Sequence, residues 1–158
     1  MESLWTRKHR AATTLSCVTT EQAGAAAGDS DIYVSAFNGD SFAMPTLAPG
    51  LNTASNDNRP NLRRDGLEIF FDSNRPGTYG GHDLWTSTRA STSDPWSLPT
   101  NLGPGVNSTV DDLRPTLSWD ATTLYFGSVC PGGEGSQDLY VITCATNCSD
   151  RWRAASED

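Results

Sequence analysis

Short apolar or alternating stretches, separated by turns rich in Gly and Pro, run along most of this chain. Residues 67–73 carry apolar side chains on both faces of the predicted strand, which is typical of a central, fully buried strand. After a Gly- and Pro-rich turn at 74–81, residues 84–88 alternate and predict a half-exposed strand. A last, outer strand is expected at 96–100. No segment has a convincing helical stripe, so the pattern indicates an all-β chain.

The same pattern occurs more than once along the chain. The matching anchors lie 55 residues apart and are Arg59-Pro60 with Arg114-Pro115, Phe71 with Phe126, and Asp83-Leu84-Trp85 with Asp138-Leu139-Tyr140. Asp31-Ile32-Tyr33 is a third copy of the last group. So many anchors in register indicate a duplicated unit of roughly fifty-five residues.

Four strands in each unit predict the fold class: all-β, built of antiparallel four-stranded propeller blades. The blades fall at about 11–55, 56–110 and 111–158 of a repeat domain spanning 11–158, and residues 1–10 match the repeat poorly. This makes about two and a half to three blades, whereas a propeller closes with about 4–8. The propeller is therefore incomplete unless it is closed by oligomerisation, and we expect either self-association or a larger parent chain.

One stretch of the repeat is similar to a known family. Arg114-Pro115, Leu117-Ser118, Asp120 and Leu124-Tyr125-Phe126, followed by Pro131-Gly132-Gly133 and Asp138-Leu139-Tyr140, resemble the WD-like β-propeller repeat of TolB-type bacterial envelope proteins. The resemblance covers roughly residues 29–144. It implies a periplasmic or extracellular binding module, although no signal peptide is visible and a cytoplasmic location stays open.

Charge and hydropathy narrow the range of partners. The 158 residues include 11 Lys and Arg against 19 Asp and Glu, a formal net charge of −8. Binding to a phosphate backbone relies on clustered basic residues, so the balance argues against nucleic acid. No run of eighteen apolar residues is present, and no membrane span is expected.

Candidate ligand-binding residues gather around the predicted inner strands. Inner strands line a propeller's central channel, so Asp–Arg pairs there, joined by an Asn from the preceding loop, would ring its mouth and could hold a peptide terminus or a sugar. The alternative is that each Asp–Arg pair is a structural ion pair within its blade. The Pro after each Arg favours an extended backbone at that Arg. The predicted site residues are Asn52, Asp57, Arg59, Asn107, Asp112, Arg114 and Trp119.

Recurring aromatic residues are expected to pack between blades. Tyr33, Trp85 and Tyr140 are equivalent in the repeat, as are Phe42, Trp96 and Trp152. Trp119 differs, because its equivalent is Arg64 in a turn, so we expect it to be exposed.

Metal and cofactor chemistry has weak support. Asp31, Asp83 and Asp138 recur after Gly-rich turns and could bind calcium, but fixing the turn through backbone N–H groups explains them better. We therefore expect no cofactor and no metal site. The cysteines are Cys17, Cys130, Cys144 and Cys148, and three disulfide pairings are open.

No nucleophile elbow, phosphate-binding loop or zinc-protease motif is present in the sequence. The leading hypothesis is a non-catalytic propeller module that binds a protein, peptide or glycan around the channel. Two alternatives stay open: a glycan-active hydrolase or lyase, and a purely architectural, self-associating arc.

Overall fold

The computed structural model describes residues 13–17 and 30–144 of the protein. The described residues form ten strands and no helix, and hence contain no helix able to cross a membrane. The strands are β1 (Thr13–Cys17), β2 (Ile32–Ala36), β3 (Thr46–Leu47), β4 (Asp57–Leu62), β5 (Glu68–Ser73), β6 (Asp83–Thr88), β7 (Thr100–Asn101), β8 (Asp112–Leu117), β9 (Thr123–Ser128) and β10 (Asp138–Thr143).

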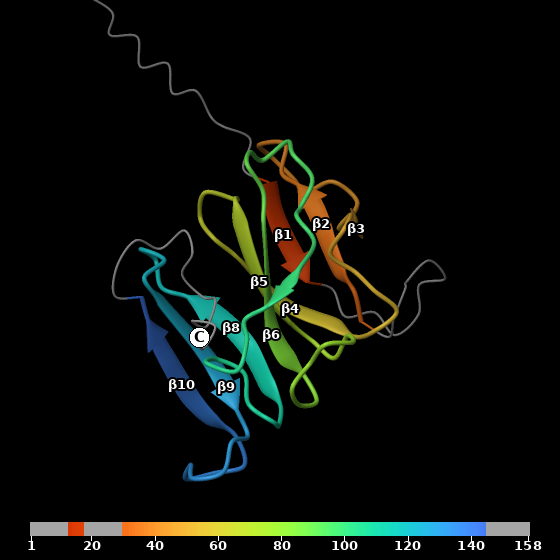
Figure 1. The fold of residues 1–158 in the computed structure, drawn as a ribbon. Helices are drawn as coiled ribbons and strands as arrows, with labels where there is room; N and C mark the ends of the chain where they lie inside the picture. The colour runs from red at the N-terminus through yellow and green to blue at the C-terminus, as the bar shows by residue number, and fades with distance from the viewer. Residues whose placement is uncertain (1–12, 18–29, 145–158) are drawn as a thin grey trace, which may run out of the picture.

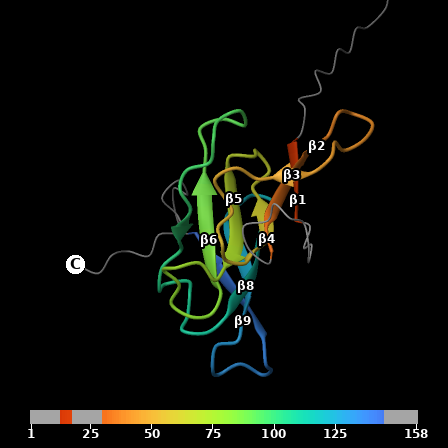
Figure 2. The same ribbon diagram turned by 90° about the vertical axis from the view of Figure 1, so that its right-hand side faces the viewer.

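The strands form three antiparallel sheets, each a simple meander in chain order. The first holds β1–β3, the second β4–β7 and the third β8–β10, and they follow one another through the molecule (Figures 1 and 2). The prediction of an all-β, antiparallel fold is confirmed. Only the middle sheet has four strands within the described residues, and none of the three sheets closes on itself there.

The outer strand of the middle sheet differs from the prediction. Strand β7 is Thr100–Asn101, which pairs with Trp85 and Thr86, so the expected strand at 96–100 is wrong. Ser97 instead caps the loop, because its N–H donates to the Thr88 carbonyl and its own carbonyl accepts from the Ser87 hydroxyl. Edge pairing therefore begins only after the loop has ended.

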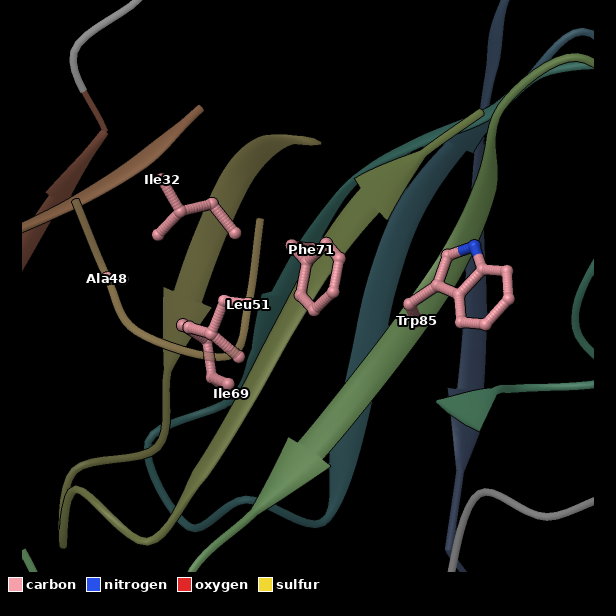
Figure 3. Packing of buried hydrophobic residues seen from close by; sticks show 6 residues of the cluster. All are labelled: Ile32, Ala48, Leu51, Ile69, Phe71 and Trp85. Atoms are coloured by element: carbon pink, nitrogen blue, oxygen red, sulfur yellow. The ribbon is translucent and has the colours of Figure 1, made fainter. Parts of the chain in front are cut away.

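The core lies between the sheets. All six residues of β5 are buried, as predicted for a central strand, because alternate side chains face opposite neighbours. One cluster joins the first and second sheets and another joins the second and third. The first contains Ile32, Ala48, Leu51, Ile69, Phe71 and Trp85 (Figure 3), and the second contains Phe70, Leu84, Leu102, Leu124 and Phe126.

Of the recurring aromatics, Trp85, Trp96 and Tyr140 pack in these layers. Trp85 is buried in the first cluster, and Tyr140 packs on the second with its ring 5.9 Å from that of Phe126. Each of the two thus faces the sheet that precedes its own. Phe42 is an exception, because it is 54% exposed and pairs only with Phe37 at the end of its hairpin. Trp152 lies outside the described residues.

The third sheet leaves one apolar face uncovered. Leu139 and Val141 on β10 and Tyr125 on β9 are all exposed, Leu139 by 76%. Their counterparts in the middle sheet include Leu84 and Phe70, which are fully buried against the third sheet. The exposed face of the third sheet is thus equivalent in the repeat to the face of the middle sheet that the third sheet buries.

Candidate ligand-binding site

The two predicted Asn residues close their own sheets. The Asn107 amide accepts from the Leu84 N–H at 2.8 Å and donates to the Leu84 carbonyl at 3.0 Å. Asn52 makes the same pair of bonds to Ile32, at 2.7 and 2.9 Å. Each side-chain amide thus makes the two hydrogen bonds that a residue of a neighbouring strand would make. Its carbonyl oxygen and its NH₂ group are therefore both bonded within the fold.

Asp57 is a buried anchor. Its carboxylate accepts from the N–H and hydroxyl of Thr53, from the Ser73 hydroxyl, and from the Arg75 guanidinium at 2.5 Å. The expected Asp57–Arg59 ion pair is therefore wrong, because buried Arg75 lies closer to this carboxylate and also donates to the Leu51 carbonyl.

Asp112 repeats only half of that arrangement. One oxygen accepts from the N–H and hydroxyl of Ser108, at 2.5 and 2.9 Å. The other is buried and has no hydrogen-bond partner within the described residues. The position equivalent to Arg75 is occupied by Cys130, which is a free thiol. Asp112 is thus not paired with Arg114 either.

Arg59 and Arg114 lie at equivalent points of β4 and β8, where the backbone departs from regular strand geometry in the same way. Their φ angles are +48° and +58°, in the left-handed region, which corrects the expected extended backbone. In both strands the pairing register shifts at this point, so Arg-Pro forms a β-bulge. Pro has no N–H to offer the ladder, and the bulge accommodates it. Such a backbone costs about 1–3 kcal/mol and persists only where other contacts hold it.

Asp72 contacts both arginines. This fully buried carboxylate lies 2.8 Å from the Arg59 guanidinium and accepts the main-chain N–H of Arg114 at 3.0 Å. The His82 Nδ1 lies 3.5 Å from the same carboxylate. Arg114 in turn donates its guanidinium N–H to Gln137 at 2.6 Å. We call these five residues the Asp72 cluster.

The Asp72 cluster links Arg59 of the middle sheet to Arg114 of the third sheet. Sequence reasoning missed Asp72 and Gln137. A signal was present, because Asp72 stands where the next repeat has Gly127, and His82 stands where it has Gln137. Positions at which two copies of a repeat carry different residues are candidates for a role that only one copy performs.

Trp119 lies elsewhere. It is 78% exposed, as predicted, in the turn between β8 and β9. Arg114 of the Asp72 cluster lies near the opposite end of β8, which begins at Asp112. The guanidinium of Arg64 stacks over the indole at 4.0 Å. The seven predicted residues therefore separate into sheet-closing anchors, the pair of arginines, and this distant tryptophan.

The recurring Asp residues act in turns. Asp83 accepts the N–H of Tyr79 and the side-chain amide of Asn101, at 2.8 and 2.7 Å. Asp138 accepts the N–H of Glu134 at 3.2 Å. Within residues 13–17 and 30–144, no group of three or more His, Cys, Asp or Glu side chains is placed to hold a metal ion.

The fold and the cluster define an all-β protein of antiparallel sheets with a charged cluster between two of them. Neither a scan against protein-family models nor a search of curated proteins finds a match to this chain.

Proposed function

We propose that this protein is a non-catalytic binding module and that its ligand docks on the Asp72 cluster. The observation that carries the proposal is that one buried carboxylate contacts both arginines, because Asp72 binds the guanidinium of Arg59 and the main-chain N–H of Arg114. Arg59 remains 39% exposed while bound to Asp72, and among the described residues the guanidinium of the exposed Arg114 bonds to neutral Gln137 alone. Two oriented guanidinium groups at one surface suit a ligand with anionic oxygens.

The ligand class we propose is a protein, peptide or glycan that presents a carboxylate, such as a peptide C-terminus or an acidic sugar. Arg binds a carboxylate through two parallel hydrogen bonds, and part of each guanidinium is free to do so. The buried Asp72 holds the guanidinium of Arg59 and the backbone of Arg114 in place, which lowers the ordering cost of binding.

The proposal extends to architecture and location. Three successive antiparallel sheets with a shared repeat support an incomplete β-propeller of the TolB-like type, and that resemblance would imply a periplasmic or extracellular module. Catalysis is the weaker alternative. A glycan-active enzyme needs two converging carboxyl groups, but Asp111 accepts the His82 N–H while Asp112 is buried against Ser108.

Titration with matched probes tests the binding site. The probes are an N-acetylated tripeptide with a free C-terminal carboxylate, its C-terminal amide, glucuronic acid and glucose. We expect the two carboxylates to shift the Arg114 amide resonance in NMR spectra and the two neutral probes to leave it unchanged. The double variant Arg59→Ala/Arg114→Ala should lose affinity by at least about tenfold, which corresponds to one lost interaction of modest strength.

The controls separate binding from folding. Arg59→Lys/Arg114→Lys keeps both charges without the planar fork and should bind with intermediate affinity. Arg89→Ala removes a positive charge outside the cluster and should bind normally. Equal affinity of the Ala double variant and the native protein for the carboxylate probes would remove the cluster from consideration.

A second candidate function is architectural. The exposed face of Tyr125, Leu139 and Val141 supports self-association, because the equivalent face of the middle sheet is covered by the next sheet. Sedimentation velocity of the native protein and of Leu139→Asp tests this. We expect the native protein to associate in a concentration-dependent way and the variant to sediment as a monomer with an unchanged Tm. A native protein that is monomeric at high micromolar concentration would refute it.

A further inference from the structure

A pocket lies between two hairpin turns, away from the Asp72 cluster. The turn joining β4 to β5 and the turn joining β8 to β9 face each other across the boundary of the second and third sheets, with Arg64 of one stacked on Trp119 of the other. The pocket is an open, shallow depression with a volume of about 570 Å³. The pocket is lined by Arg63, Arg64, Asp65, Trp119, Asp120 and Ala121.

The turn that carries Trp119 is held rigidly by its own side chains. Asp120 accepts from the Ser118 hydroxyl at 2.6 Å and from the N–H and hydroxyl of Thr122 at 3.1 and 2.9 Å. Ser118 accepts the N–H of Thr123 at 3.0 Å. Ala121 takes a φ of +55°, where the equivalent turn has Gly66 at +75°. The indole is thus presented by a preorganised loop rather than by packing in the core.

Trp119 offers one open aromatic face. The residue is 78% exposed, and the Arg64 guanidinium lies over one side of its ring at 4.0 Å from the centroid. A cation above a ring fixes its orientation through attraction to the π-electrons. Removing so large an apolar surface from water is favourable, so a held, exposed indole is a ready platform for a flat apolar surface of a ligand.

The polar groups of the pocket define the rest of the ligand. Two arginines and two aspartates line it, which leaves no net charge to attract an ion. Arg64 has no hydrogen-bond partner within the described residues, and of the two Asp120 oxygens only one accepts a bond there. Donors and an acceptor are thus both available beside the ring. A nucleic acid would meet the chain's net charge of −8.

We propose that this pocket binds a neutral saccharide, with Trp119 stacking against the sugar ring and Arg64 and Asp120 bonding its hydroxyl groups. A pyranose combines an apolar face of C–H groups with hydroxyls that both donate and accept, which matches each feature of the pocket. The site is independent of the one proposed above. Arg64 precedes β5 whereas Asp72 lies near its end, and Trp119 follows β8 whereas Arg114 lies near its start.

NMR titration of the native protein with maltopentaose, cellopentaose and chitopentaose tests the site. The reporter is the indole N–H resonance of Trp119, assigned with Trp119→Phe. We expect a saturable shift with at least one of the three sugars up to about 10 mM, a range that detects millimolar dissociation constants. Trp119→Ala should weaken that binding by tenfold or more, and Trp119→Phe, which keeps an aromatic face, by less.

Matched variants make the outcome decisive. Arg59→Ala/Arg114→Ala should bind the sugar as the native protein does, so failure of the Asp72 site leaves this result unaffected. Because Trp119 is exposed, its variants should melt at the native temperature. The proposal is overturned if none of the sugars moves the indole resonance, if Trp119→Ala binds as well as the native protein, or if only a peptide moves the resonance.

Discussion

The carboxylate of Asp72, on the middle sheet, accepts the main-chain N–H of Arg114, on the third sheet, at 3.0 Å. The same carboxylate also binds the guanidinium of Arg59 at 2.8 Å. One buried side chain therefore contacts two inner strands at once, through the side chain of Arg59 and the left-handed backbone of Arg114. In the next repeat its place is taken by Gly127, so the bond has no second copy at the equivalent position.

Replacing Asp72 should weaken the boundary between the sheets. Asp72→Ala leaves the Arg114 N–H without its acceptor, and an unsatisfied buried group of this kind costs about 1–3 kcal/mol. Chemical denaturation of the native and variant proteins measures the difference. The matched control is Asp40→Ala, at an exposed position, which should change the free energy of unfolding by less than about 0.5 kcal/mol. Equal stability of both variants would show that this bond is not essential.

Arg75 should contribute more to stability than any arginine on the surface. It donates to buried Asp57 and to the Leu51 carbonyl, so Arg75→Ala leaves an uncompensated buried carboxylate. Breaking such a pair by removing one partner costs about 3–5 kcal/mol. Arg75→Lys retains the charge and should lose less. Thermal denaturation ranks the three proteins, and a loss below about 1 kcal/mol in the Ala variant would contradict this role.

Asn107 should be a stability residue and not a ligand contact. Asn107→Ala removes both hydrogen bonds to Leu84 in the core and should cost about 1–3 kcal/mol. Asn52→Ala removes the corresponding bonds to Ile32 and should act in the same direction. Hydrogen exchange of the Leu84 and Ile32 amides reports each loss separately. Faster exchange at Leu84 in Asn52→Ala alone would show that the two anchors are not independent.

The turn around Trp119 should weaken in acid. The pKa of Asp120 lies below its ordinary value of 3.8, because the Ser118 hydroxyl and the Thr122 N–H and hydroxyl donate to the carboxylate. A carboxyl whose folded pKa is depressed stabilises the fold fully above its unfolded pKa, and this contribution disappears as pH falls through the folded value. The Tm advantage of the native protein over Asp120→Asn should therefore be constant above about pH 5 and shrink towards pH 2. An advantage that does not change with pH would contradict this.

The sequence predicts the layers well but the bulges poorly. Apolar residues on both faces of 67–73 correctly indicated a central strand, because burial on two faces leaves a continuous apolar run that composition reveals directly. The Arg-Pro pairs suggested extended backbone, since Pro normally restrains its predecessor in that way. A bulge reverses this preference, and at Arg114 the main-chain N–H is bonded to a carboxylate 42 residues away, on the middle sheet. Local rules contain no information about that partner.

The same limit applies to the site. Asp57 and Asp112 were selected because they recur in the repeat, and both are buried residues that hold their own sheet together. A duplicated unit keeps the residues that each copy needs in order to fold, so recurrence marks structural residues. The arginines belong to the repeat as well, but the residues that orient them do not. Asp72 and His82 are found only by asking where the two copies disagree, and their proximity is visible only once the sheets are packed.

The Asn side chains have a consequence for how the protein can be divided. Asn107 completes the middle sheet, although it follows the last strand of that sheet, and Asp112 then starts the third sheet. A fragment of the middle sheet that stops after β7 would expose the polar backbone of Leu84 inside its own core. Truncations and domain fusions should therefore cut directly after Asn107, so that the middle sheet keeps the amide that completes it and Ser108 stays with Asp112.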